Sequence, residues 1–296
     1  MLGWIRGFAT MSSPRDPRLA VLIKVLRIPH AAFGVVVIAI TVLAALFAPL
    51  IVPISPEEMD FDNLLSDMSW QHLLGSDQMG RDTLARLIYG ARVALFVSLG
   101  AIGLGVAIGV PLGLISVYFG GFVDDIIMRV MDSLVVFPSL LIAVGLAAAL
   151  GGSLPTVILA IGIANVPWMA RVIRSQGLSI REMDFVAAAE AGGMSHTRII
   201  FKHILPNSIA PVIVQSTLSM GYAVLTEAAL GFIGVGIQPP TPTWGNMLQQ
   251  AFPMLEQQAL LSVVPGLAIF LLVLSFNFVG DAMRDVLDPR LKGVIH

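Results

Sequence analysis

The chain contains no cysteine and few charged residues. Without a thiol it can form neither a disulfide nor a thiolate metal site. Charged residues make up 12% of its 296 residues and hydrophobic residues 56%, against about 25% and 45–50% in ordinary soluble domains. A globule of this composition would have too little polar surface to face water, so we expect lipid to be the main solvent. The net charge of -2 gives no reason to expect a nucleic acid as partner.

Motifs for catalysis and nucleotide binding are also absent from the sequence. A phosphate-binding P-loop needs a glycine directly before its lysine, but none of the three lysines, Lys24, Lys202 and Lys292, follows a glycine. The sequence has no His-Glu-x-x-His zinc motif and no Gly-x-Ser-x-Gly elbow. An intramembrane aspartyl protease is disfavoured because Asp132 and Asp281 lie at predicted cytoplasmic helix ends. We therefore predict a chain that is not an enzyme and has no metal or other cofactor.

Apolar runs predict an all-α, polytopic membrane protein with about six transmembrane helices. A helix needs about 20 apolar residues to cross the hydrocarbon, and the uncharged runs 31–52 and 93–118 each supply one. The uncharged stretch 133–170 contains a turn signal at residues 151–155, so we expect two helices joined by a hairpin there. Residues 209–231 and 259–280 supply the fifth and sixth helices.

These runs divide the chain into five predicted parts. The first helix is long for a signal-peptide core and no small-residue cleavage site follows it, so we expect a retained signal anchor. The parts are a cytoplasmic N-terminal segment at 1–30, the first helix at 31–53, an extracytoplasmic loop with an interfacial helix at 54–92, a five-helix membrane core at 93–282 that includes a cytoplasmic loop at 175–208, and a cytoplasmic tail at 283–296.

Arginine and lysine predict the orientation, because short cytoplasmic loops retain an excess of them. The loop before the second helix has three arginines but seven acidic residues, and the loop after the fifth helix has neither lysine nor arginine. We therefore expect a protein of the cytoplasmic (inner) membrane with both termini in the cytoplasm. The basic residues of the predicted cytoplasmic side are Arg6, Arg15, Arg18, Lys24, Arg27, Arg129, Arg171, Arg174, Arg181, Arg198, Lys202, Arg284, Arg290 and Lys292.

The loop between the fourth and fifth helices is predicted to be a helix-turn-helix. Residues 182–191 are rich in helix formers, and Gly192 and Gly193 end that helix. Ser195 can cap a second helix, which Pro206 is expected to end. Alanines within 187–191 give the first helix a small face that another protein could approach closely. An ordinary basic loop packed on its own helices would explain the same composition, and this alternative stays open.

The spacing within this loop resembles the coupling-loop signature of ABC importer permeases. The matching residues are 185–189 (Phe-Val-Ala-Ala-Ala), Gly193 and 203–207 (His-Ile-Leu-Pro-Asn). In that family the loop inserts a short helix into a cleft on a separate ATPase subunit. The family usually has an acid where this chain has Ala187, and Glu190 lies one turn later without being its equivalent. The resemblance implies that the ATPase-coupling residues are Ala187, Ala188, Ala189, Gly193, Met194, Ser195, His203, Leu205 and Pro206.

Other stretches narrow the resemblance to the C-type permease of dipeptide, oligopeptide and nickel importers. They are 75–82 (Gly-Ser-Asp-Gln-Met-Gly-Arg-Asp), 87–92, 227–232, 239–245 and 287–290. The resemblance covers about residues 74–291. It implies a type I ABC importer permease fold and a heterodimer with a B-type permease subunit. It also implies two ATP-binding subunits on the cytoplasmic side and an extracytoplasmic solute-binding protein.

Two helix faces carry further expectations. Residues 82–92 could form an amphipathic interfacial helix with Arg86 toward water, although a plain surface helix fits equally well. Gly105, Gly109 and Gly113 are four residues apart, which predicts a face that another helix approaches closely. Whether that neighbour belongs to this chain or to a partner stays open.

Glu227 and the proline-rich segment after the fifth helix are the remaining candidate sites. An ionisable residue in an apolar run is costly, so Glu227 indicates either a transport path or a structural hydrogen bond. Pro239, Pro240 and Trp244 are candidate contacts for the solute-binding protein, although a stiff exposed turn with no partner would look the same.

The leading hypothesis is a permease subunit of an ATP-driven importer of dipeptides or oligopeptides that forms half of the translocation path by alternating access. Nickel or another small solute is the closest alternative. A free-standing channel or secondary transporter is a different class, disfavoured by the sparse intramembrane charge. A purely structural membrane scaffold is a third class.

Overall fold

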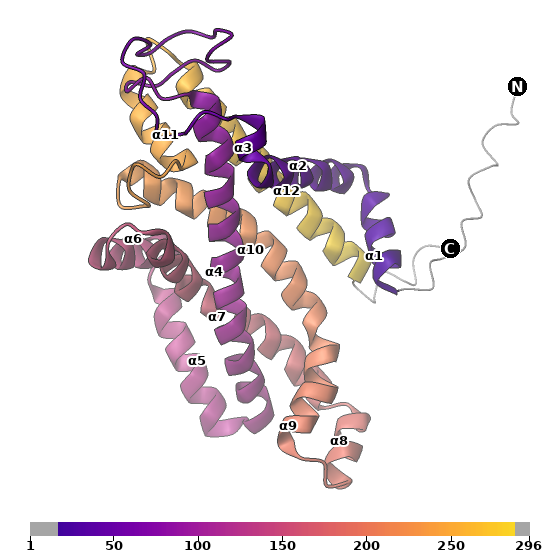
Figure 1. The fold of residues 1–296 in the computed structure, drawn as a ribbon. Coiled ribbons are helices and arrows are strands. Elements are labelled where there is room, and N and C mark those ends of the chain that lie inside the picture. The colour runs from indigo at the N-terminus through magenta and orange to yellow at the C-terminus, as the bar shows by residue number, and fades with distance from the viewer. Residues whose placement is uncertain (1–16, 288–296) are drawn as a thin grey trace, which may run out of the picture.

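The structure is a computed structural model that describes residues 17–287 (Figure 1). Within this range every regular element is helical and no strand is present, which confirms the all-α prediction. A π turn at Ile200–Ile204 joins α9 to α10, and a 3-10 turn at Phe252–Met254 follows α11. The helices are α1 (Pro17–Leu26), α2 (Pro29–Leu46), α3 (Ala48–Ile51), α4 (Thr83–Phe119), α5 (Gly121–Val136), α6 (Ser139–Leu150), α7 (Leu154–Arg181), α8 (Asp184–Ala191), α9 (His196–Ile199), α10 (Leu205–Ile233), α11 (Trp244–Ala251) and α12 (Leu260–Leu287).

The long helices α4, α7 and α10 form the centre of the molecule, with α2 and α12 to one side (Figure 1). The main core is built from small and branched side chains of α4 and α7, including Val97, Ala101 and Ile161. A Cβ atom on Gly113 would stand 2.5 Å from the carbonyl oxygen of Ala170. The predicted small-residue face is therefore confirmed, and its neighbour is α7 of the same chain.

Five helical stretches are long and apolar enough to cross a membrane: α2, α4, α7, the continuous stretch His196–Ile233 and α12. A sixth crossing requires α5 and α6 together, and these two helices bend by 83° relative to each other. The architecture agrees with about six spans. The third span, expected from residue 133 to the turn at 151–155, differs from the prediction because it is broken in the middle.

The break between α5 and α6 has a local cause. Pro138 lacks an amide hydrogen, and its ring disfavours helical backbone at the preceding residue. Phe137 accordingly has extended angles (φ -84°, ψ 134°), and α6 begins at Ser139. The 16 residues of α5 and 12 of α6 measure about 24 Å and about 18 Å. Neither helix alone crosses a hydrocarbon core of about 30 Å.

The turn predicted at 151–155 is confirmed. Helix α6 ends at Leu150, and Gly151 has a φ of +89°, which favours glycine. The Ser153 hydroxyl accepts a hydrogen bond from the Thr156 N–H at 3.3 Å and so caps the start of α7.

The separate interfacial helix expected before the second span is not formed. Residues 83–92 are the first turns of α4, which Asp82 caps by accepting from the Ala85 N–H at 2.7 Å. The expectation that Arg86 faces water is wrong, since its side chain is only 1% exposed. Side chains of the preceding loop and of α11 contact it, and these segments are too distant in sequence for local periodicity to indicate them.

Pro206 does not end the second helix of the loop between α7 and α10, contrary to the prediction. The helix that starts at His196 continues through the π turn into α10, and the Leu205 N–H donates to the Ile200 carbonyl five residues back. A proline inside a helix has no amide hydrogen to donate, and its ring clashes with the carbonyl group four residues earlier. The wider π turn moves that carbonyl group away from the ring. The loop is therefore continuous with a membrane-crossing helix.

The predicted N-terminal segment and tail lie partly outside the described residues. Arg6, Arg15, Arg290 and Lys292 fall outside 17–287, as do residues 288–290 of the family-like tail.

Candidate functional site

The loop between α7 and α10 lies at the end of the molecule opposite α11 (Figure 1). Helix α8 ends at Ala191, and Gly193 adopts a φ of +72° that favours glycine. Ser195 then occupies the N-cap position of α9, but its side chain makes no capping hydrogen bond. The helix-turn-helix prediction is confirmed, and the side-chain cap expected at Ser195 is not formed.

One side of α8 is anchored and the other is exposed. Val186 is 1% exposed and belongs to the same core cluster as Ile199 and Ile204. This packing leaves part of the predicted coupling set on the surface. Ala187, Ala188, Gly193, Ser195 and Pro206 are exposed, whereas Ala189, Met194, His203 and Leu205 are half-buried.

Three large apolar side chains of this loop are also exposed, and the sequence reasoning did not assign them. Met183, Phe185 and Phe201 are 44%, 40% and 63% exposed. The Phe185 ring lies 6.0 Å from the His203 ring, between centroids. Their signal in the sequence is a large apolar residue directly beside a charged one: Met183 and Phe185 flank Asp184, and Phe201 precedes Lys202. They enlarge the surface that a partner protein could cover.

Polar contacts hold this loop to the end of α4. The Tyr118 hydroxyl and the His196 Nδ1 atom form a hydrogen bond. The Arg181 guanidinium donates to the Val117 carbonyl at 2.8 Å. A displacement of the loop therefore acts directly on α4.

Two ion pairs join α5 to α7. The Arg174 Nε atom donates to Asp124 Oδ1 at 2.6 Å, and the Ser116 hydroxyl donates to the same oxygen. The Arg171 Nη2 atom lies 2.6 Å from Asp132 Oδ1. The sequence reasoning used both arginines only as orientation signals and missed these pairs.

The break between α5 and α6 leaves an open hollow of about 220 Å³. Beside it, the hydroxyls of Ser139 and Tyr222 lie 2.7 Å apart in a hydrogen bond. Tyr222 is 44% exposed and Trp168 is 47% exposed, and both lie near the middle of their long helices. The hollow is lined by Leu134, Val135, Phe137, Pro138, Ser139, Ile142, Ala164 and Trp168.

Glu227 lies inside the chain, on the side of α10 that faces the start of α11. Its side chain is 1% exposed. The Thr243 side chain lies beside the carboxyl group, and Glu227 Oε1 has no hydrogen-bond partner within residues 17–287. Thr243 also accepts from the Asn246 N–H at 3.1 Å, which caps α11. The carboxyl group thus belongs to the contact between α10 and α11.

The proline-rich segment between α10 and α11 begins with exposed prolines and ends at a buried tryptophan. Pro239 and Pro240 are exposed. Trp244 is only 4% exposed, and its indole N–H donates to the Leu87 carbonyl at 2.9 Å. The expectation that Trp244 offers a surface contact is therefore wrong in this chain, because the indole joins α11 to α4.

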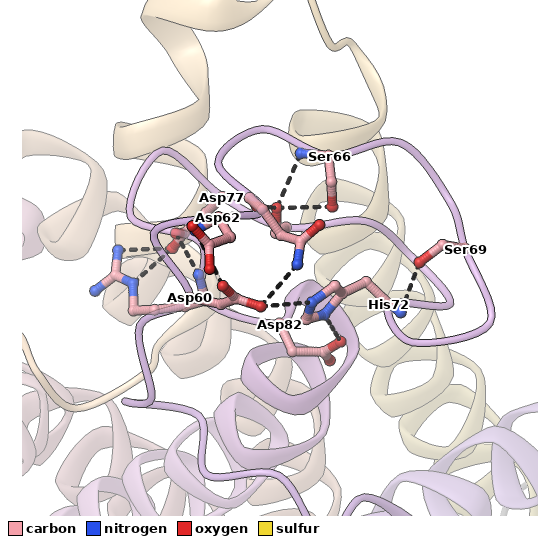
Figure 2. Close-up of polar contacts among 10 residues, drawn as sticks. Asp60, Asp62, Ser66, Ser69, His72, Asp77 and Asp82 are labelled. Carbon is pink, nitrogen blue, oxygen red and sulfur yellow. Dashed lines mark hydrogen bonds and ion pairs between the residues drawn. The ribbon is translucent and has the colours of Figure 1, made fainter.

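A polar cluster folds the loop between α3 and α4, residues 52–82 (Figure 2). The His72 Nδ1 atom lies 2.8 Å from Asp82 Oδ2, and its Nε2 atom lies 3.9 Å from Asp60 Oδ2. Hydrogen bonds from the Asn63 amide and the Asp62 N–H hold the pKa of Asp60 below its ordinary value. Asp60 and Asp82 are thus bound by other groups of the same loop.

Comparison with known proteins finds related chains of similar length. Residues 105–293 match the family described as binding-protein-dependent transport system inner membrane component. The dipeptide transport system permease protein DppC of Alkalihalophilus pseudofirmus is 45% identical over 262 residues, which cover 88% of this chain and 86% of that protein. The di/tripeptide transport system permease protein DppC of Pseudomonas aeruginosa is 42% identical, covering 88% of both chains. The glutathione transport system permease protein GsiD of Escherichia coli is 39% identical, covering 86% and 85%.

A solved structure of the MetNI methionine ABC transporter, in inward-facing conformations, contains a chain of similar fold. The TM-score is 0.56 with 20% sequence identity, and the match covers 69% of this chain and 97% of that chain. At this identity the likeness concerns the fold alone, and it confirms the predicted ABC importer permease fold.

The relatives are named as permease proteins, which confirms the prediction of a non-catalytic transport subunit. The family description and the apolar helices confirm a multi-pass protein of the inner membrane that works with other subunits. The chain therefore belongs to the family of binding-protein-dependent transport system inner membrane components.

Proposed function

We propose that this chain is the permease subunit of an ATP-driven importer of dipeptides or oligopeptides and forms half of the translocation path. The observation that carries the proposal is the 45% identity to a dipeptide permease over 88% of the chain. The identity extends over most of the chain, so it includes the helices that would line the path as well as the loop that would meet the ATPase.

In this proposal, α8 docks on an ATP-binding subunit. Val186 anchors α8 in the core, while Ala187 and Ala188 leave a small exposed face that another surface can approach closely. The exposed Phe185 and Phe201 supply apolar area at the same end. Two ATP-binding subunits would serve this chain and a B-type permease subunit, as a heterodimer.

The coupling loop and both termini are assigned to the cytoplasm. The last turns of α7 carry Arg171, Arg174 and Arg181, and the loop that follows carries Arg198 and Lys202. Short cytoplasmic loops and the helix ends beside them retain such residues. The loop at 52–82 then faces outward, and its exposed acidic residues can contact a solute-binding protein. Pro239 and Pro240, between α10 and α11, are candidate contacts for the same protein.

The broken helix α5–α6 is proposed to line the path. Non-helical backbone at membrane depth is tolerated only where protein buries it or a water-filled cavity receives it. The Ser139 and Tyr222 hydroxyls beside the break are poor groups to present to lipid for the same reason. A path between this chain and the partner permease would satisfy both conditions.

The first test is the composition of the purified complex. The tagged chain, extracted in mild detergent, is expected to bring down a second permease and ATP-binding subunits. Their ATPase rate should rise when binding protein and a dipeptide are added together. A chain that purifies without an ATPase would favour a free-standing channel or secondary transporter.

The second test separates solutes. Uptake of labelled dipeptides, longer peptides and nickel is compared in cells with and without this chain. Loss of nickel uptake with unchanged peptide uptake would support the alternative solute, and no transport defect of any kind would support a structural scaffold.

A further inference from the structure

Two buried arginines lie where the α3–α4 loop, α4 and α11 meet. Arg81 is 3% exposed and Arg86 is 1% exposed. The Arg81 Nε atom donates to Asp77 Oδ2 at 2.7 Å, and the Arg86 Nε atom lies 3.6 Å from the same oxygen. One largely buried carboxylate, whose position is labelled in Figure 2, thus faces two guanidinium groups.

Asp77 is already saturated by other donors. Its Oδ1 atom accepts from the N–H groups of Met79 and Arg81, at 2.8 Å and 3.0 Å. Its Oδ2 atom is held by the Arg81 side chain. A separation of 3.6 Å is too long for a hydrogen bond. Asp82, the carboxylate next along the chain, is held by His72. Within residues 17–287, Asp77 is therefore the single carboxylate at ion-pair distance from the two guanidinium groups, and Glu57 acts on Arg86 from farther away.

One nitrogen of the Arg86 guanidinium has a single distant hydrogen-bond acceptor and another has none within residues 17–287. Its Nη2 atom lies 3.5 Å from Gln250 Oε1, and that oxygen already accepts from Arg81 at 2.7 Å. Its Nη1 atom is buried and has no partner in the described part of the chain. The Thr83 Oγ1 atom is also buried and has no hydrogen-bond partner within residues 17–287. A buried donor without an acceptor is costly, and more so when it is charged.

Both unpartnered groups line one small cavity. Its space accommodates little more than a single water-sized group. Apolar side chains of α11 and α12 form part of the wall. The lining residues are Asp77, Gln78, Thr83, Arg86, Met247, Gln250, Ala251 and Leu261.

We propose that this cavity binds a monatomic anion of the size of chloride, which accepts hydrogen bonds from Arg86 Nη1 and Thr83 Oγ1. An anion supplies the missing acceptor and also adds negative charge beside two guanidinium groups that share one carboxylate, whereas water supplies only the acceptor. The small space favours a monatomic ion over a larger anion. The bound ion bridges the α3–α4 loop, α4, α11 and α12, so it stabilises this end of the fold. This role is independent of the transported solute.

The test is the thermal unfolding midpoint of the full-length chain in detergent, measured in sodium chloride and in sodium gluconate at equal ionic strength. Chloride is expected to raise the midpoint by roughly 2–4 °C, in a saturable manner. Thr83→Val keeps the side-chain shape but removes the hydroxyl donor, so most of this shift should disappear. Thr41→Val is the matched control, because the Thr41 hydroxyl donates within α2 to the Val37 carbonyl at 2.9 Å.

Bromide locates the site directly. Anomalous diffraction from crystals grown in bromide should show a peak between Arg86 and Thr83, and this measurement holds even if Thr83→Val does not fold. Equal midpoints in the two salts, or a chloride shift that Thr83→Val retains in full, would overturn the proposal. A water molecule in place of the bromide peak would overturn it as well.

Discussion

Gly109 of α4 lies so close to α7 that a Cβ atom at this position would stand 2.6 Å from the carbonyl oxygen of Val166. That separation is below van der Waals contact, and the obstacle is backbone, which cannot rotate away. Gly109→Ala should therefore separate the two helices and lower the free energy of unfolding by about 1–3 kcal/mol. Thermal unfolding of the purified chain in detergent measures the effect.

The control for this prediction lies on the same helix. A Cβ atom on Gly103 would meet nothing within 4 Å in the described chain. Gly103→Ala should therefore leave the unfolding midpoint unchanged or raise it slightly, because alanine favours helix over glycine by about 0.5–1 kcal/mol. Equal losses in the two variants would contradict the packing argument.

The pair between Arg174 and Asp124 predicts a measurable coupling between α7 and α5. The side chains are 33% and 15% exposed, so the pair is partly shielded from solvent. A double-mutant cycle with Arg174→Ala and Asp124→Ala should give a coupling of about 1 kcal/mol, near the upper end for exposed pairs. Asp125→Ala, at an exposed neighbouring carboxylate, is the control and should show little coupling to Arg174. A coupling near zero for Asp124 would refute the pair's contribution.

Ala187 and Ala188 are both exposed on α8, so substitutions at the two positions can be compared to test contact with the ATPase. The coupling-loop signature that this loop resembles has an acid at the position of Ala187, so we expect Ala187→Glu to keep peptide-stimulated ATPase activity. Ala188→Glu places the same charge on the small face that we expect to contact the ATPase, and it should abolish that stimulation. The measurement is the ATPase rate of the purified complex at equal subunit content. Equal effects of the two substitutions would count against docking through this face.

The hydroxyls beside the helix break can be tested by cysteine labelling, because the chain contains no cysteine of its own. Ser139→Cys and Tyr222→Cys should react with a charged, water-soluble thiol reagent, and a transported peptide should slow the reaction. Phe270→Cys on α12 is the control, since Phe270 is 58% exposed in an apolar helix that we expect to face lipid. If only a lipid-soluble reagent labels all three positions, the break does not line an aqueous path.

Glu227→Gln should leave uptake near the wild-type level. The side chain is buried beside Thr243 at the start of α11, so a neutral polar side chain of the same shape retains the contact. Glu227→Leu removes the polar group beside Thr243 and should lower the amount of folded protein in the membrane. Uptake is compared at equal protein level, and a strong loss of uptake in Glu227→Gln would favour a path role for the carboxyl group.

Much of the fold could be predicted because membrane solvation acts on composition over whole segments. The runs that became α2, α4, α7 and α12 are long and apolar, and glycine and proline mark turns at fixed positions, as at Gly151. The face at Gly105, Gly109 and Gly113 was also predictable, since helical periodicity alone brings these residues together. Its neighbour was not, because any helix can meet a small face.

The sequence by itself determined the solvent of this protein, its helical class, the approximate number of spans and the loop that resembles a coupling element. Only the tertiary structure decided that Arg86 and Trp244 are buried, that Pro206 lies within a continuous helix and that Arg174 meets Asp124. The burial of Arg86 and Trp244 and the pair between Arg174 and Asp124 depend on segments that are far apart in the chain, and local periodicity carries no information about which distant side chain covers a given surface. The π turn before Pro206 is local, but the preference of proline for helix ends does not indicate it.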